Sequence, residues 1–92
     1  MDIQKYLDLI GNNIRQTRVR SGVNQATLAK KAGVSRSTIQ SAERGKSIAL
    51  EHILRIAIAL KIDPADLFLT DEDRQITYKA KLFWESIFNL KK

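Results

Sequence analysis

Residues 36–44 carry side chains that could hydrogen-bond to nucleic acid. If this segment is a helix, Ile39 marks its inward side. The side chains on the opposite side are Ser37, Gln40, Ser41 and Arg44. In the major groove of DNA, Gln suits adenine, Arg suits guanine and Ser suits either base. An ordinary polar helix face is the alternative, but no acid points outward and the flanks at residues 30–31 and 46 are basic. The pattern therefore favours a helix that contacts DNA.

A short turn must join this helix to the one before it. Gly33 is expected to end the preceding helix, because only glycine takes a positive φ without penalty. Asn24 is placed to cap the start of that helix, and Ser35 is placed to cap the start of the next. The small side chain of Ala29 suits the close crossing that such a turn requires. The segment is therefore predicted to hold two short helices that cross closely.

The positive charge of the chain is concentrated in its first half. The 92 residues carry a net charge of +6 at pH 7. Residues 1–46 hold nine Lys and Arg against three acids, whereas residues 47–92 hold seven of each kind. A basic field of this kind attracts polyanions such as nucleic acid. A solubilising surface is the alternative that the charge alone leaves open.

Other kinds of chemistry have little support in the sequence. The chain has no Cys and a single His, His52, which excludes disulfides, thiolate ligands and a His-rich zinc cluster. No nucleophile elbow or glycine-rich phosphate loop is present. We therefore expect no enzyme activity, no cofactor and no metal site. The N-terminus lacks a signal-peptide pattern and no uncharged run reaches about 18 residues, so the sequence predicts a cytoplasmic, nucleoid-associated protein without a membrane partner.

The apolar spacing is helical almost throughout, so the predicted fold is all-α. The first helix is expected over residues 3–19, in one or two pieces around residues 11–13. A fourth helix is expected at about residues 49–60. Its expected buried side consists of Leu50, Ile53, Leu54, Ala57 and Leu60. A short fifth helix follows, with Asp63 as its cap and Pro64 at its first position.

The two short helices and the segment after them match a known pattern at many positions in fixed order. The first part of the match is Gln25-x-x-Leu28-Ala29-x-x-x-Gly33-Val34-Ser35-x-x-x-Ile39-x-x-x-Glu43-x-Gly45. The second part is Leu50-Glu51-x-Ile53-Leu54-x-Ile56-Ala57-x-Ala59-Leu60-x-Ile62-x-Pro64-x-x-Leu67-Phe68. Over roughly residues 9–69 the chain resembles the phage repressor/Cro (XRE) family of helix-turn-helix transcriptional regulators. It departs from the family pattern at Ala42, where a larger apolar residue is usual, so looser local packing is expected. It also departs at Ala49, which replaces a common Ser cap, and at Lys61, which replaces a common Gly after the fourth helix.

The resemblance implies a five-helix repressor-type domain whose third helix enters the major groove, usually as a dimer on a palindromic site. The positions at which the family contacts bases correspond to Arg36, Ser37 and Ser41, with Gln40 beside them. The positions near phosphates correspond to Gln25, Thr38, Arg44 and Lys46. The positions of a structural pair that ties the first helix to the recognition helix correspond to Arg18 and Glu43. Arg36 is expected to give the most specificity, because a bidentate Arg–guanine contact gives about 1–3 kcal/mol of discrimination.

A last helix is expected beyond the helix-turn-helix domain. We divide the chain into a DNA-binding domain at residues 1–69 and a C-terminal helix at residues 70–92, which Thr70 and Asp73 open as a capping box. One face of this helix is apolar at helical spacing. Its residues are Ile76, Ala80, Phe83, Trp84 and Ile87. The face is expected either to pack on the same domain or to form a seam between two copies, with a membrane surface or another protein as further alternatives.

As a whole, the sequence favours a sequence-specific DNA-binding transcriptional regulator of the repressor type that binds a palindromic operator as a dimer. Its expected partners are double-stranded DNA and a second copy of the chain, in a homodimer. The alternative is an antitoxin-like or other protein-interaction module, whose C-terminal helix holds a second protein and whose DNA binding is secondary.

Overall fold

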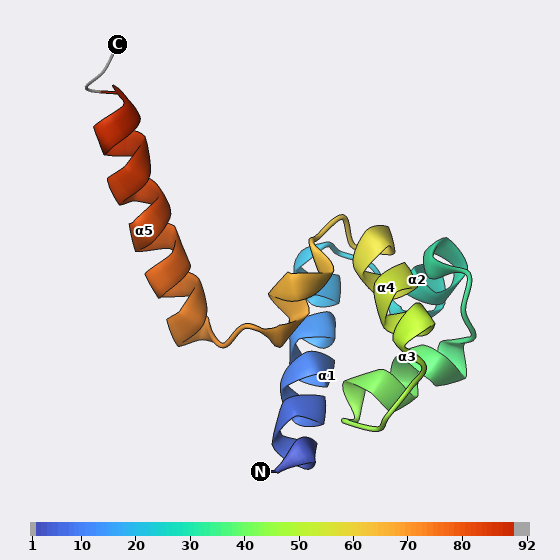
Figure 1. Ribbon diagram of the computed structural model, residues 1–92. Coiled ribbons are helices and arrows are strands. Elements are labelled where there is room, and N and C mark those ends of the chain that lie inside the picture. The colour runs from blue at the N-terminus through green and yellow to red at the C-terminus, as the bar shows by residue number, and fades with distance from the viewer. Residues whose placement is uncertain (1, 90–92) are drawn as a thin grey trace.

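The described part of the chain is built from helices and their connections. The computed structural model describes residues 2–89, apart from the side chains of residues 77, 78, 84, 88 and 89. The elements are α1 (Ile3–Arg20), α2 (Gln25–Ala32), α3 (Arg36–Glu43), α4 (Leu50–Ala59), the 3-10 helix η1 (Pro64–Phe68) and α5 (Asp71–Asn89) (Figure 1). The predicted all-α class is confirmed. In detail, α1 is one continuous helix, and the short fifth helix is a 3-10 helix.

Local signals in the sequence set the ends of the two short helices. The Asn24 side chain accepts a hydrogen bond from the Thr27 N–H at 2.8 Å and caps α2. Gly33 ends α2 with a φ of 70°, in the left-handed region that favours glycine. Ser35 Oγ accepts a hydrogen bond from the Thr38 N–H at 3.0 Å and caps α3. The predicted caps and the predicted glycine stop are confirmed, and they place α2 and α3 on either side of a short turn.

One apolar core joins α1, α2, α3, α4 and η1. Each of these five elements contributes one fully buried large side chain. These side chains are Ile14, Leu28, Ile39, Ile56 and Leu67. Burial of a side chain of this size contributes about 1.5–3 kcal/mol. The five elements therefore form one unit, residues 3–68, which we call the bundle.

The bundle is closely packed where α1 crosses α3. A Cβ built on Gly11 of α1 would collide with the carbonyl oxygen of Ala42 on α3. Ala42 is itself buried, at 4% exposed. The looser packing expected from Ala42 is therefore not observed here, because a glycine on the facing helix matches the small side chain.

The buried amide of Asn13 ties α1 to the end of η1. Its side chain is 3% exposed, and Nδ2 donates to the carbonyl oxygens of Leu67 at 2.8 Å and Leu69 at 2.9 Å. A buried polar group of this kind needs such partners, since leaving it unpaired costs about 1–3 kcal/mol. These two hydrogen bonds from α1 therefore hold the end of η1 and the residue that follows it in place, where the chain leaves the bundle.

The buried side of α4 differs from the predicted one. Ile53, Ile56, Ala57 and Leu60 are buried. The predicted burial of Leu50 and Leu54 is wrong, since these side chains are 65% and 40% exposed. Apolar residues surround most of α4, and spacing alone does not select which part of a broad apolar surface meets the core.

The helix α5 extends away from the bundle (Figure 1). Thr70 and Asp73 form the predicted capping box: the Thr70 N–H donates to Asp73 Oδ2 at 3.1 Å, and the Asp73 N–H donates to Thr70 Oγ1 at 3.0 Å. Arg74 Nη2 donates to the carbonyl oxygen of Asp66 at 2.9 Å. This last bond links the first turn of α5 to η1.

The described apolar side chains of α5 are mostly exposed. Ile76 and Phe83 are each 61% exposed, and Leu82 is 47% exposed. Of the other residues on the predicted apolar face, Ala80 is exposed and Ile87 is half-buried. Much of the described apolar surface of α5 therefore faces solvent in the single chain.

Some predictions for the C-terminal region fall outside the described structure. The side chain of Trp84 and residues 90–92 lie beyond what is described. The domain boundary after residue 69 and the role of the apolar face remain predictions. Among the helices of the described chain, none is long and apolar enough to cross a membrane.

Candidate nucleic-acid interface

The helix α3 presents a polar face without an acid. Ile39 and Ala42 are buried beneath the helix, which turns its opposite face outward. On that face Ser37 and Arg44 are exposed, and Gln40 and Ser41 are half-buried. Arg36, the first residue of α3, is also exposed, although it stands only three positions before the buried Ile39. The four predicted base-contacting residues are thus all at least partly accessible on α3.

The residues predicted to contact phosphates lie around this face. Gln25 is the first residue of α2 and is half-buried, and Lys46 follows the turn after α3 and is exposed. Thr38 lies in the first turn of α3, where its Oγ1 is 2.9 Å from Ser35 Oγ. The first N–H groups of a helix have no intrahelical acceptor and attract anions. The starts of α2 and α3 therefore offer donors beside the polar face.

Arg18 and Glu43 form a salt bridge that holds α3 against α1. Arg18 Nε donates to Glu43 Oε2 at 2.8 Å and Nη2 donates to Oε1 at 2.9 Å, with side chains 13% and 5% exposed. Arg18 Nη1 also donates to the Val23 carbonyl at 3.1 Å, and Gln25 Nε2 donates to Glu43 Oε1 at 3.4 Å. The hydrogen bond to Glu43 raises the pKa of Arg18, although burial lowers it, so the guanidinium stays charged. This network joins α1, α2 and α3.

The backbone after α3 is held by the first turns of α1. Gln4 Nε2 donates to the Gly45 carbonyl at 2.8 Å and to Asp8 Oδ1 at 2.8 Å. Gly45 has a φ of 78°, and a Cβ there would collide with the Asp8 carboxylate. The chain therefore leaves α3 in a fixed direction, which sets the position of Lys46.

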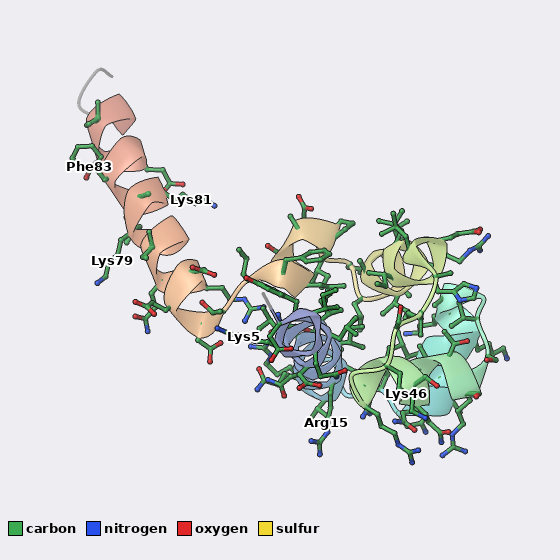
Figure 2. The ribbon with its side chains drawn as sticks, turned by 60° about the horizontal axis from the view of Figure 1, so that its bottom comes forward. Lys5, Arg15, Lys46, Lys79, Lys81 and Phe83 are labelled. Atoms are coloured by element: carbon green, nitrogen blue, oxygen red, sulfur yellow. The ribbon has the colours of Figure 1, made fainter. Side chains whose placement is uncertain are left out.

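A hollow of about 260 Å³ lies where α1, α2 and α3 meet. It is lined by Arg15, Gln25, Gln40, Glu43 and Arg44. Arg15 is exposed, and Figure 2 shows it on the side of the bundle that carries the basic side chains of α3. Arg15 is not among the residues that the sequence predicts to contact DNA. Its proximity to the recognition helix arises from packing between helices that are distant in sequence, and no local pattern marks it.

This geometry suits nucleic-acid binding. Within the described residues, no group of three His, Asp or Glu is placed to hold a metal ion. Two short helices joined by a tight turn, the second with an exposed polar face and basic flanks, have the arrangement of a helix-turn-helix that enters the major groove. The fold and the surface define the class as a helix-turn-helix DNA-binding protein.

Comparison with known proteins gives the family. The family HTH_3, described as helix-turn-helix, matches residues 14–67. The chain belongs to this family, the XRE/Cro-type helix-turn-helix transcriptional regulators, and it is a DNA-binding protein rather than an enzyme.

Individual relatives agree with this assignment. The chain is 39% identical over 66 residues to an uncharacterized transcriptional regulator in the ATPase CF(0) region of Rhodospirillum rubrum, a match that spans 71% of this chain but only 60% of that protein. Among solved structures it is similar to the restriction-modification controller protein C.AhdI from Aeromonas hydrophila, with 40% identity, a TM-score of 0.65, and coverage of 67% of this chain and 96% of that one. It is also similar to the hypothetical transcription factor NHTF from Neisseria, with 31% identity, a TM-score of 0.74, and coverage of 84% and 90%.

Proposed function

We propose that the chain is a repressor-type regulator that binds a palindromic DNA operator as a homodimer, with α3 of each copy in the major groove. The observation that carries this proposal is the acid-free outer face of α3, held against α1 by the Arg18–Glu43 salt bridge. Occupancy of the operator would block transcription without a cofactor. Such a protein acts where the DNA is, in the cytoplasm.

In this proposal the outer face of α3 contacts base edges. The contacting residues are Arg36, Ser37, Gln40 and Ser41. Arg36 supplies the largest share of specificity, because a bidentate contact to guanine discriminates by about 1–3 kcal/mol. Serine discriminates less, so sequence-dependent DNA shape supplies the remaining selectivity.

The flanking residues hold the DNA backbone. They are Gln25, Thr38, Arg44 and Lys46. Contacts of this kind fix the position of the protein on the duplex and carry no sequence information themselves. They also make binding weaken as salt increases, since each phosphate that is neutralised releases counterions.

Two copies join through α5 in this proposal. The exposed side chains of Ile76 and Leu82 support it, because exposed apolar patches usually mark interfaces. One half-site buries only about 600–1,000 Å² of protein surface. Two joined copies double this area, and their twofold symmetry accounts for a palindromic operator.

Selection of binding sites from random duplexes tests the proposal. The expected product is an inverted repeat, bound by a species with the mass of a dimer in sedimentation equilibrium. Arg36→Ala should then lose discrimination at one position of each half-site when a panel of single-base variants is titrated by fluorescence anisotropy. A single half-site bound by a monomer would contradict the dimer, and an unchanged ranking of the panel would contradict the role of Arg36.

A second candidate function is a protein-interaction module in which α5 binds a different protein and DNA binding is secondary. The exposed apolar side chains of α5 favour it as much as they favour a dimer. A chain that ends at residue 69 retains the whole buried core, which lies within residues 10–67. If that chain keeps full affinity for a palindromic site but loses a copurifying protein, the second candidate is supported. If it loses cooperative binding to the palindrome, the dimer is supported.

A further inference from the structure

The hollow between α1, α2 and α3 has the lining of an anion site. Arg15 approaches it from α1 and Arg44 from the end of α3, so two guanidinium groups come from different helices. The amides of Gln25 and Gln40 line the same space. Both arginines are exposed, and within the described residues neither side chain forms an ion pair or a hydrogen bond. Their donors are therefore available to a ligand.

The acid in this lining does not oppose an anion. Both carboxylate oxygens of Glu43 accept hydrogen bonds from Arg18, and Oε1 is also close to Gln25 Nε2. The Glu43 side chain is only 5% exposed, so it presents little of its charge to the hollow. Arg18 compensates that charge within the protein, which leaves the positive charges of Arg15 and Arg44 in excess.

We propose that this hollow binds one phosphate diester of the DNA backbone, and that Arg15 is a DNA-contacting residue. The proposal rests on the function given above, in which α3 enters the major groove. Arg15 and Arg44 would contact the phosphate from two sides, since guanidinium groups suit the paired oxygens of a phosphate. Gln25 would add a neutral donor. A phosphate contact from α1, made beside the DNA contacts of α3, would fix how far α3 enters the major groove.

The experiment compares Arg15→Gln with a matched control, Arg20→Gln, in the full-length chain. Both variants remove one exposed arginine from α1. Arg20, however, does not line the proposed site. It lines a hollow near the start of α5 with Leu60, Asp66 and Arg74, and a second hollow along α1 that it shares with Arg15. Each protein is titrated by fluorescence anisotropy with a random duplex and with the selected operator, at several salt concentrations. Thermal melts of both variants report whether the fold is retained.

The expected result is specific to Arg15. For each bound copy, Arg15→Gln should reduce affinity roughly five- to tenfold at 0.1 M salt and make the slope of log K against log salt shallower by about 1, or by about 2 for the dimer on the operator, which is the loss of one phosphate contact in each copy. The loss should be equal for all operator variants, because a phosphate contact carries no sequence information. Arg20→Gln should change neither the affinity nor the slope.

Other outcomes separate the two levels of the proposal. If the unmodified chain binds DNA and Arg15→Gln leaves its slope and affinity unchanged, the phosphate site is refuted while the function stands. If Arg15→Gln changes the ranking of operator variants, Arg15 contacts a base and the phosphate site is likewise refuted. If the unmodified chain binds no DNA at any salt concentration, the proposed function fails and the phosphate site fails with it.

Discussion

The bundle and α5 place their apolar side chains in opposite environments. In the bundle, twelve apolar residues are buried in one cluster to which all five elements contribute. On α5, the described side chains of Ile76 and Phe83 are 61% exposed, and the helix leads away from the bundle. In Figure 2, Phe83 lies on a part of α5 that is well away from the bundle, on which Arg15 and Lys46 are labelled. The bundle buries its apolar side chains within one chain, whereas these side chains of α5 stay mostly exposed to solvent.

This difference separates the part that folds around its own core from the part that we propose assembles with a second copy. Most helix stability in proteins comes from packing an apolar face, and an isolated helix of moderate length is marginal in water. Under the proposed dimer, the stability of the bundle should not depend on protein concentration, whereas the helicity of α5 should rise with association. The following variants test that separation through the free energy of unfolding of the bundle.

The largest effect is expected from Glu43→Ala. Removing this carboxylate leaves the charge of Arg18 largely buried without its partner, which should destabilise the bundle by about 3–5 kcal/mol in denaturant unfolding. The control is Glu51→Ala, which breaks an exposed pair with Arg55 and should change stability by less than about 1 kcal/mol. Equal effects of the two variants would show that the Arg18–Glu43 bridge does not hold the bundle together.

The next effect is expected from Gly11→Ala. Helix propensity alone predicts that this change stabilises α1 by about 1 kcal/mol. The collision of the new Cβ with the Ala42 carbonyl should outweigh this gain and destabilise the bundle by about 1–3 kcal/mol. Gln16→Ala, at an exposed position of α1, serves as the propensity control. A gain in stability from Gly11→Ala would mean that α1 and α3 are farther apart than described.

A smaller effect of opposite sign is expected from Lys61→Gly. Lys61 follows α4 with a φ of 59°, a conformation that costs a side chain roughly 1–2 kcal/mol and glycine nothing. Part of the gain is offset by the greater freedom of glycine in the unfolded chain. The free energy of unfolding should therefore rise by up to about 1 kcal/mol. A higher melting temperature in thermal denaturation would report this gain. A fall in melting temperature would indicate that the Lys61 side chain makes a compensating contact.

The smallest effect on the bundle is expected from Ile76→Asp. Its side chain lies on α5, outside the core, so the unfolding free energy of the bundle should change by no more than about 0.5 kcal/mol. Sedimentation equilibrium should nevertheless show weaker association, since a charge would enter the proposed seam. Glu85→Lys changes the charge of an exposed residue half a turn around α5 from Ile76 and provides the control. A marked loss of bundle stability would mean that α5 folds back onto the core.

The sequence predicts best the features that depend on neighbouring residues. The caps at Asn24 and Ser35, the turn at Gly33 and the capping box at Thr70 follow from backbone conformations and side-chain donors within a few positions, and all four are present. The burial of Ile39 on α3 also follows, because only one side of that short helix is apolar.

Features that depend on packing between distant elements were harder to predict. Leu50 and Leu54 were expected to be buried, but the broad apolar surface of α4 offers several faces and the core selects only one. No local sequence pattern indicates the contact of Gly11 with Ala42, because this contact depends on how α1 and α3 cross. Arg15 was missed for the same reason, since its neighbours Gln40 and Arg44 are reached only through the fold.

The network around Arg18 has a consequence for the energetics of recognition. Its hydrogen bonds to Glu43 and to the Val23 carbonyl, together with the contact of Gln25 with Glu43, fix the helix α3 and the start of α2 before any ligand arrives. Such preorganisation means that little conformational entropy remains to be lost when the surface binds. A variant that loosened this network while keeping every outward-facing side chain would therefore bind more weakly through entropy alone.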